Sequence, residues 1–315
     1  HRDLHSFPTR RSSDLGNLSS GGSGKTPITI ALAKELQARG LNVVVSHRGY
    51  KGESEFGTVL VSDGSKVFKD AHTAGDEAYL IATSLSGIPV FAGRDRAAVL
   101  SKAQSMFPAT DVVILDDAFQ HIKVYRDIDV VVFDTAIGLG NGFVLPAGYL
   151  REPLTAITKD CIIVFHHKPS SKDIPANELE SKLEGCLHYH VFSKAEKLCG
   201  VEILEPKQLL GKKIALISAI AHPKSFEDSV LALGLSFEEH YRFPDHYAYL
   251  DLGRLEDIRI ENRDYLVCTS KDAGKLQVYP EFRKKLLALQ METSLPEPFV
   301  ESIIQRLGIS INDRN

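Results

Sequence analysis

Residues 16–27 read Gly-Asn-Leu-Ser-Ser-Gly-Gly-Ser-Gly-Lys-Thr-Pro and carry more structural information than any other stretch of the chain. Their Gly-Lys-Thr is the core of a phosphate-binding loop, in which glycines turn backbone N–H groups toward a phosphate chain. The lysine reaches the β- and γ-phosphates and the threonine hydroxyl binds magnesium. We therefore predict that nucleotide binding involves these residues: Ser20, Gly21, Gly22, Ser23, Gly24, Lys25 and Thr26.

A helix is expected to follow the loop directly. Pro27 suits a first helical turn, the helix continues through Leu36, and Gly40 is a typical stop. Its positive end would face the phosphates. Ser19 stands where the usual loop has a glycine, and the alternative interpretation is a glycine-rich turn before an ordinary helix. The complete Gly-Gly-Ser-Gly-Lys-Thr sequence followed by a helix favours nucleotide binding.

Length and composition indicate a globular protein of about two domains. The chain has 315 residues, 43% of them hydrophobic and 25% charged, and its net charge of −4 gives no indication of a nucleic-acid partner. The four cysteines are not closely paired, so neither a zinc site nor a disulfide framework is predicted, and a reducing cytosolic setting fits. No apolar run approaches the ~18–20 residues that cross a bilayer.

Residues 1–15, His-Arg-Asp-Leu-His-Ser-Phe-Pro-Thr-Arg-Arg-Ser-Ser-Asp-Leu, are unusual. They are rich in arginine and serine, lack the apolar core of a secretory signal, and stand where an apolar strand should lead into the phosphate loop. We predict a non-native leader and exclude it from the expected fold.

The remainder alternates between short apolar runs and helical patterns, which predicts a doubly wound, mostly parallel sheet of the P-loop NTPase type. A nucleotide-binding and catalytic domain is expected at 16–192 and a smaller α/β lobe at 193–315. In the first domain we expect strands at 41–46, 89–92, 111–115, 128–133 and 161–165, a hairpin at 59–68 and helices at 74–85 and 94–107. In the second half we expect strands at 213–219 and 265–269, helices at 223–233 and 252–261, and a strand or linker at 187–198.

Charged residues follow several of these strands, at the edge where such sheets bind ligands. Asp116 and Asp117 end an apolar strand and are predicted to hold magnesium, although a pair of helix-capping acids is the alternative. Arg48 and Arg96 suit phosphate groups of an anionic substrate, or are ordinary surface residues. The glycine- and proline-rich segment 140–153 includes Arg151, and is either a functional loop or a plain one.

Three acidic segments remain ambiguous on local evidence. Asp76 and Glu77 open a helix, which favours a helix cap over a general base. The pair Asp245-His246 suits proton transfer, but a surface turn after a proline is a strong alternative. Residues 269–272, Thr-Ser-Lys-Asp, follow a strand and either contact a nucleotide base or cap a helix.

Taken in order, these segments resemble the tetraacyldisaccharide 4′-kinase family of lipid A synthesis. The likeness extends from Gly16 to about Leu276 and rests on the order of several short motifs. They are the 16–27 loop, Arg-Gly-Tyr at 48–50, Gly-Asp-Glu at 75–77, Asp-Arg at 95–96, Asp-Asp-Ala-Phe-Gln-His at 116–121, Leu-Pro-Ala-Gly-Tyr-Leu-Arg-Glu-Pro at 145–153, Asp-His at 245–246 and Thr-Ser-Lys-Asp-Ala at 269–273.

The resemblance implies transfer of the γ-phosphoryl group of ATP to the 4′-hydroxyl of a tetraacylated disaccharide 1-phosphate. It implies that Asp76 is the catalytic base, assisted by His246 and Lys25, which reverses the local preference for helix caps and turns. Magnesium would be held by Thr26, Asp116, Asp117 and Glu152. The implied substrate contacts are Asn17, Arg48, Arg96, Gln120, His121 and Arg151.

The resemblance also implies a peripheral protein at the cytoplasmic face of the bacterial inner membrane, with the lipid A precursor as partner, and neither nucleic acid nor a protein partner is expected. Ala118 and Ser270 depart from the family's usual glycine and glutamate. The family carries a hydrophobic N-terminal helix and a first strand, which we expect this chain to lack or to have lost to the leader. Two alternatives stay open: another P-loop kinase acting on a small soluble substrate, and an NTP-dependent switch or metal-insertion protein.

Overall fold

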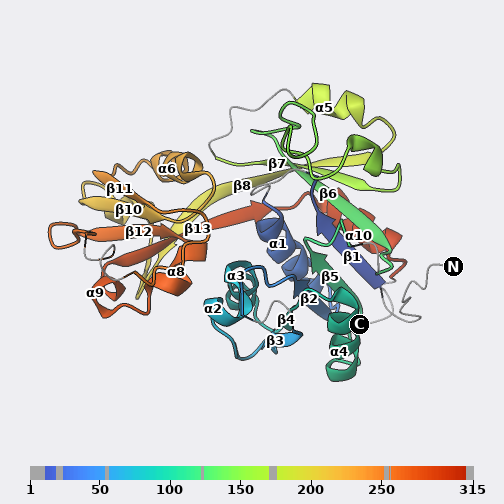
Figure 1. The fold of residues 1–315 in the computed structure, drawn as a ribbon, viewed down its shortest axis with the longest axis horizontal. Helices are drawn as coiled ribbons and strands as arrows, with labels where there is room; N and C mark the ends of the chain where they lie inside the picture. Colours follow the sequence, from blue (N-terminus) through green and yellow to red (C-terminus); the bar gives the residue numbers. More distant parts are fainter. Residues whose placement is uncertain are drawn as a thin grey trace. The chain divides into compact units, whose positions relative to one another are not determined.

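The computed structural model describes residues 11–18, 24–53, 57–121, 124–169, 176–251, 255 and 257–309. The chain forms two compact units. Unit 1 comprises residues 1–168, 172–192 and 293–315, and unit 2 comprises 169–171 and 193–292. Each unit is an α/β structure, and Figure 1 shows the elements of both.

Unit 1 is built on a parallel sheet in the order β8-β7-β6-β1-β5-β2-β4, with β3 added antiparallel at the edge. Strand residues are buried on both faces, as expected where helices cover a parallel sheet on both sides. The strands are β1 Arg11–Gly16, β2 Val43–His47, β3 Val59–Ser62, β4 Val90–Ala92, β5 Val112–Asp116, β6 Ile128–Asp134, β7 Ile162–His167 and β8 Leu187–Cys199.

Alternate residues of each strand enter different cores. Val112 and Ile114 of β5 pack with one helical layer, whereas Val113 and Leu115 pack on the opposite face. The first layer contains α1, α3 and α10, and the opposite face carries α4 and α5. The helices of unit 1 are α1 Lys25–Ala38, α2 Ala71–Ala74, α3 Asp76–Ser84, α4 Arg96–Met106, α5 Ala176–Lys182 and α10 Glu297–Arg306, with the short 3-10 helix η1 at Leu154–Ala156.

The predicted doubly wound sheet is therefore confirmed, with two corrections. The exclusion of residues 1–15 from the fold is wrong for residues 11–15, because Arg11–Gly16 forms β1 between β5 and β6 at the centre of the sheet. The helix expected at 74–85 is observed as α3, but it begins at Asp76. Gly75 has φ 87°, which a helix interior does not allow, and it separates α3 from the short helix α2.

Unit 2 has its own parallel strands in the order β11-β10-β12-β13, and β9 pairs antiparallel with the end of β8. The helix α6 covers one face through Phe226 and Val230, and α8 and α9 cover the other through Leu276 and Phe282. The elements are β9 Ile203–Leu204, η2 Pro206–Leu209, β10 Ile214–Ser218, α6 Pro223–Ala232, β11 Glu239–Arg242, β12 Tyr265–Thr269, α8 Ser270–Leu276, α9 Pro280–Arg283 and β13 Leu286–Ser294. The helix expected at 252–261 lies partly outside the described residues.

The chain enters unit 2 along β8 and returns to unit 1 along β13. Residues 293–315, which the sequence assigned to the smaller lobe, are part of unit 1. The reason is the apolar face of α10, whose Phe299, Ile303 and Leu307 are fully buried in the core that also holds α1. Within the part of the chain that is described, no helix has the length and apolar character of a membrane span.

Candidate active site

The start of α1 is shaped for a phosphate group. The helix begins at Lys25 rather than at the predicted Pro27, because Gly24 caps it with φ 86°. A Cβ atom at Gly24 would lie 2.0 Å from Nδ1 of His166, so both the conformation and the space require glycine. Of the predicted nucleotide-binding residues, Ser20, Gly21, Gly22 and Ser23 lie outside the described residues.

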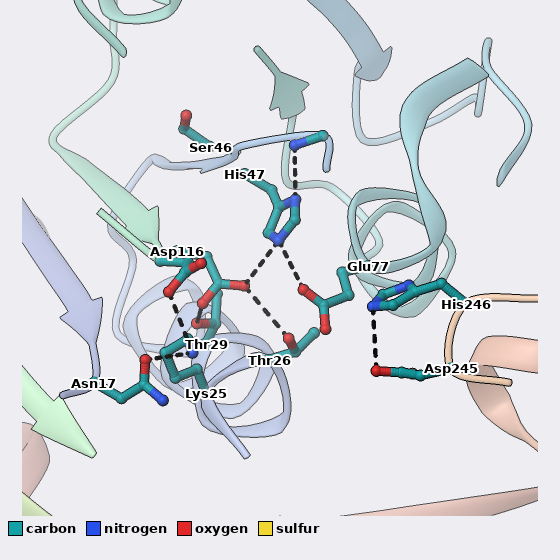
Figure 2. Close-up of polar contacts among 12 residues, drawn as sticks. Asn17, Lys25, Thr26, Thr29, Ser46, His47, Glu77, Asp116, Asp245 and His246 are labelled. Carbon is teal, nitrogen blue, oxygen red and sulfur yellow. Dashed lines mark hydrogen bonds and ion pairs between the residues drawn. The ribbon is translucent and has the colours of Figure 1, made fainter. Parts of the chain in front are cut away.

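Lys25 connects the ends of two strands at this edge of the sheet. Its ammonium donates a hydrogen bond to Oδ1 of Asn17 at 2.8 Å (Figure 2) and lies 3.2 Å from Oδ1 of Asp117. Asn17 directly follows β1, and Asp117 directly follows β5. A partly buried lysine in this position can neutralise charge on a bound phosphate chain.

Asp116 is the buried carboxylate of the site. It accepts a hydrogen bond from the hydroxyl of Thr29 at 3.0 Å and a longer one from Thr26 at 3.5 Å. Burial raises the pKa of Asp116, and the charges of His47 and Lys25 offset only part of that effect. These hydrogen bonds hold the Asp116 carboxylate next to the hydroxyl of Thr26, which we predicted to bind magnesium.

His47, at the end of β2, connects Asp116 to α3. Its Nδ1 accepts the backbone N–H of Gly49 at 2.9 Å, so its proton lies on Nε2. Nε2 is 3.0 Å from Oε2 of Glu77 and 3.9 Å from Oδ2 of Asp116. Figure 2 shows the imidazole between these two carboxylates. The first turn of α3, which begins with Asp76, is thereby held beside the acidic end of β5.

Asp117 is the more exposed member of the acidic pair and has a left-handed backbone, with φ 57°. Burial acts to raise its pKa, but the nearby Lys25 and Arg151 charges outweigh burial and leave the pKa below its ordinary value. The Arg151 guanidinium donates to Oδ1 of Asp117 at 3.1 Å. Asp117 is therefore ionised and shared between two cations.

Arg96 is located beneath this site rather than at its surface. It is 1% exposed, and its guanidinium donates to the Ser46 hydroxyl at 3.1 Å and to the Asp116 carbonyl at 2.5 Å. Burial lowers the pKa of Arg96 to about 10, so the group stays charged at neutral pH. Its contacts position the ends of β2 and β5, and the prediction that Arg96 also touches substrate stays a prediction.

Two tightly packed loops bring Arg48 and Asp76 into the same part of unit 1. A Cβ on Gly52 would lie 2.6 Å from the Gly75 nitrogen, and one on Gly75 would lie 2.8 Å from the Tyr50 carbonyl oxygen. Asp76 and Arg48 are half-buried, and the Arg48 guanidinium lies 5.6 Å from the centroid of the Tyr50 ring. These glycines therefore permit the close approach that places the segment 48–52 against the start of α3.

The remaining predicted contacts of unit 1 flank the acidic pair. The Gln120 amide donates to the Asn17 carbonyl at 2.9 Å, and His121 closes the same turn through its backbone N–H to Ala118 at 2.7 Å. Both side chains are half-buried, as is Glu152, which follows Arg151 on the loop after β6. The structure thus gathers most of the predicted substrate and metal residues at one edge of the unit 1 sheet.

The predicted pair Asp245-His246 belongs to unit 2. His246 has φ 61°, its backbone N–H donates to the Ala219 carbonyl at 3.1 Å, and its Nε2 is 3.9 Å from Oδ2 of Asp245. In the same unit Thr269 caps α8 by accepting from the backbone of Asp272, which matches the helix-cap interpretation of residues 269–272.

Sequence reasoning missed His47 and Thr29 as members of the site, and it considered Glu77 only together with Asp76, as a helix cap or a general base. A signal existed for each: His47 ends a strand on the active edge, Glu77 follows Asp76, and Thr29 lies one helical turn after Thr26. What the sequence alone did not reveal is that His47 joins carboxylates from two different elements.

The oxygen donors near Lys25 fit magnesium. Mg²⁺ is typically bound by one or two protein carboxylates, with water and substrate phosphates completing its shell. Asp116 and the hydroxyl of Thr26 provide such a small donor set. The described residues contain no group of three or more His, Cys, Asp or Glu side chains that could hold a metal ion.

Both the sequence and the fold of this chain are similar to those of known proteins. The family model described as "Tetraacyldisaccharide-1-P 4'-kinase" matches residues 15–308. The tetraacyldisaccharide 4′-kinase of Geobacter metallireducens is 37% identical over 287 residues, covering 90% of this chain and 84% of the relative. That of Pelobacter propionicus is 34% identical, covering 90% and 79%. A crystal structure titled as LpxK from Aquifex aeolicus in complex with ATP superposes with a TM-score of 0.79 at 29% identity, covering 96% of this chain and 90% of that one.

Proposed function

The chain belongs to the tetraacyldisaccharide 4′-kinase family, and from this premise we propose that the edge of the unit 1 sheet around Lys25 and Asp116 is its active site. The protein is an ATP-dependent kinase of lipid A biosynthesis that phosphorylates the 4′-hydroxyl of a tetraacyldisaccharide 1-phosphate. The observation that supports the location is the convergence of Lys25, Thr26, Asp116 and Asp117 at the start of α1.

In the proposed mechanism, Asp76 takes the proton of the acceptor hydroxyl as its oxygen bonds to the γ-phosphorus, and the bond from that phosphorus to the bridging oxygen of ADP breaks. Lys25 and Arg151 neutralise charge on the phosphate oxygens during transfer. Glu77 and His47 keep the first turn of α3, and with it Asp76, beside Asp116. Thr26, Asp116, Asp117 and Glu152 would hold magnesium, which would neutralise charge on the phosphate oxygens of ATP.

His246 has a secondary role in this proposal. The resemblance to the family implies that His246 assists the base, and we keep this role as a proposal; within unit 2 its Nε2 lies 3.9 Å from Oδ2 of Asp245. Asn17, Arg48, Gln120 and His121 are proposed contacts of the sugar and of its 1-phosphate. Because Arg96 is buried, it is proposed to support the acidic pair instead.

The acceptor carries four acyl chains, and such a molecule resides in a lipid bilayer. We therefore propose that the protein works peripherally at the cytoplasmic face of the bacterial inner membrane.

The direct test is transfer of labelled phosphate from Mg-ATP to detergent-dispersed tetraacyldisaccharide 1-phosphate. Asp76→Asn is expected to lower kcat by about 10²–10⁴-fold, as is typical when a general base is removed, and to leave the KM for ATP within about twofold. Lys25→Met should lower both kcat and the affinity for ATP. Glu184→Gln, an exposed carboxylate elsewhere in unit 1, serves as the control and should behave as wild type.

Two results would contradict the proposal. If Asp76→Asn loses ATP affinity but keeps its turnover, Asp76 is not the base. If wild-type protein hydrolyses ATP without labelling the lipid, the acceptor is a different molecule, or the protein is a nucleotide switch.

A further inference from the structure

The loop between β6 and Arg151 displays large apolar side chains to solvent. Phe143 is 63% exposed, Leu145 52% and Tyr149 57%, and Val144 between them is 36% exposed. Exposed apolar residues scattered singly are normal, but a contiguous group of this kind marks an interaction site. The loop, residues 143–149, is therefore a candidate binding surface.

The apolar side chains are held outward by an ordered backbone. Leu145 N–H donates to the Leu150 carbonyl at 2.7 Å, and Leu150 N–H donates to the Phe143 carbonyl at 3.1 Å. The Asn141 amide donates to the Ala147 carbonyl at 2.8 Å. A Cβ on Gly148 would lie 2.3 Å from the Phe143 carbonyl oxygen, so glycine is needed to close the loop. Preorganised exposure of this kind lowers the entropic cost of binding.

The loop is attached directly to the phosphate-transfer site. Leu150 is 1% exposed and anchors the end of the loop in the core. The next residue, Arg151, donates its backbone N–H to the Leu18 carbonyl at 2.5 Å and its guanidinium to Asp117 at 3.1 Å. Since a residue spans at most about 3.3–3.6 Å, Leu145 lies within about 20 Å of Arg151. A single extended lipid can therefore contact the apolar loop and the charged residues around Asp117 at the same time.

We propose that residues 143–149 bind the acyl chains of the acceptor, a role that rests on the proposed function of the site. The acceptor is an amphiphile with a phosphorylated sugar at one end and hydrocarbon at the other. The site has matching chemistry: cations and carboxylates around Asp117, followed on the same loop by Phe143, Leu145 and Tyr149. The loop thus aligns the sugar with Asp76 by holding the hydrocarbon.

The test compares an acylated with a deacylated acceptor. The variant Phe143→Ser/Leu145→Ser/Tyr149→Ser is assayed with detergent-dispersed tetraacyldisaccharide 1-phosphate at constant surface concentration, and with the water-soluble disaccharide 1-phosphate that lacks acyl chains. The KM for the acylated acceptor is expected to rise about tenfold or more, the change that loss of partial burial of a few apolar side chains produces. The kcat/KM for the deacylated acceptor and the KM for ATP should stay unchanged.

A matched control removes equally exposed apolar residues from unit 2. Val201, Ile203 and Leu210 are 78%, 65% and 58% exposed, and Val201→Ser/Ile203→Ser/Leu210→Ser should retain the wild-type KM for both acceptors. An unchanged KM of the loop variant for the acylated acceptor overturns the proposal. Equal losses on both acceptors also overturn it, because they show a structural effect on the site.

Two further measurements distinguish binding of the acceptor's acyl chains from contact with the bilayer and from phosphoryl transfer. Co-sedimentation with phosphatidylethanolamine–phosphatidylglycerol vesicles lacking acceptor reports contact with the bilayer itself. If the loop variant loses vesicle binding but keeps its KM for the acylated acceptor, the loop binds the membrane instead.

Binding of the acylated acceptor is also measured without ATP. If wild-type protein binds this lipid through the loop but does not phosphorylate it, the proposed function fails while the acyl-binding role stands.

Discussion

The guanidinium of Arg96 determines how the two acidic residues of the site are presented. It is 1% exposed and donates to the Ser46 hydroxyl and to the Asp116 carbonyl, and the more distant Asp117 carbonyl lies 3.5 Å away. Lysine has one compact ammonium and no planar fork, so it satisfies these acceptors incompletely. We expect Arg96→Lys to lower the free energy of unfolding by about 2–4 kcal/mol, measured by urea denaturation.

Arg94 provides the control for this substitution, because it lies just before α4 and is exposed. Arg94→Lys should leave the unfolding free energy within about 0.5 kcal/mol of wild type. If Arg96→Lys kept full stability and instead raised the KM for the lipid acceptor, the guanidinium would be a substrate contact and not a support.

Asp14 places a carboxyl in the middle of the sheet. It is fully buried in β1; its Oδ1 accepts the Ala118 N–H at 2.9 Å, whereas its Oδ2 has no hydrogen-bond partner among the described residues. Burial raises the pKa of Asp14 well above its ordinary value. The folded protein therefore binds this proton more tightly than the unfolded chain does, and stability falls as the pH rises from the ordinary pKa through the raised one.

We predict that Asp14→Asn stabilises the protein at about pH 8 by at least about 1 kcal/mol, since each unit of pKa displacement corresponds to about 1.4 kcal/mol. The gain should shrink as the pH is lowered through the raised pKa, because the wild-type carboxyl is then neutral as well. Thermal unfolding across this pH range measures the effect, and the exposed Asp160→Asn is the control. A gain independent of pH would argue against a buried ionised carboxylate.

At the level of helices and strands, apolar periodicity predicted most of unit 1. Runs such as Val112–Leu115 and Ile162–Phe165 were recognisable because both faces of a parallel strand are buried. β1 was not recognisable, because Ser12, Ser13 and Asp14 are polar although all three are buried. Its place in the sheet comes from parallel pairing with β5 and β6, which no local pattern in the segment expresses.

The candidate site was predictable to the extent that its residues follow strands or begin helices. Lys25, Asp116 and Asp117 were identified in this way, and the structure brings them together. The burial of Arg96 was not predictable, since Asp95-Arg96 at a helix start is usually exposed. That outcome depends on the packing of α4 against β2 and β5, which is a property of the tertiary structure.

The segment 243–249 of unit 2, which carries His246, is held by another buried carboxylate. Asp272 accepts from the Thr269 hydroxyl at 2.6 Å, the Ala219 N–H at 3.2 Å and the Tyr249 hydroxyl at 3.1 Å. Because Asp272→Ala removes the acceptor of three hydrogen bonds, two of them buried, we expect it to cost about 2–4 kcal/mol of unfolding free energy. Tyr249→Phe removes one donor and should cost about 1 kcal/mol in the same urea titration. Equal costs for the two variants would mean that Asp272 does not organise the segment.

At the scale of the whole molecule, unit 1 includes α10, the last described helix of the chain. Residues 293–315 return to unit 1 after the chain has formed unit 2. There α10 buries Phe299, Ile303 and Leu307 in the core that contains α1, and Arg39 of the α1 C-cap donates to both carboxylate oxygens of Glu297. The helix α1, at whose start we propose that the nucleotide binds, therefore depends on residues far away in sequence.

This dependence predicts a large difference between two substitutions in α10. Phe299→Ala removes a fully buried ring that packs 5.4 Å from the Tyr189 ring, centroid to centroid, and should cost about 3–5 kcal/mol. Glu297→Ala removes an exposed ion pair and should cost at most about 1 kcal/mol. Urea unfolding of both variants, with ATP affinity measured under conditions where each remains folded, separates stability from site geometry. If Phe299→Ala lowered the free energy of unfolding no more than Glu297→Ala does, and neither variant changed the affinity for ATP, α10 would not support the core of unit 1.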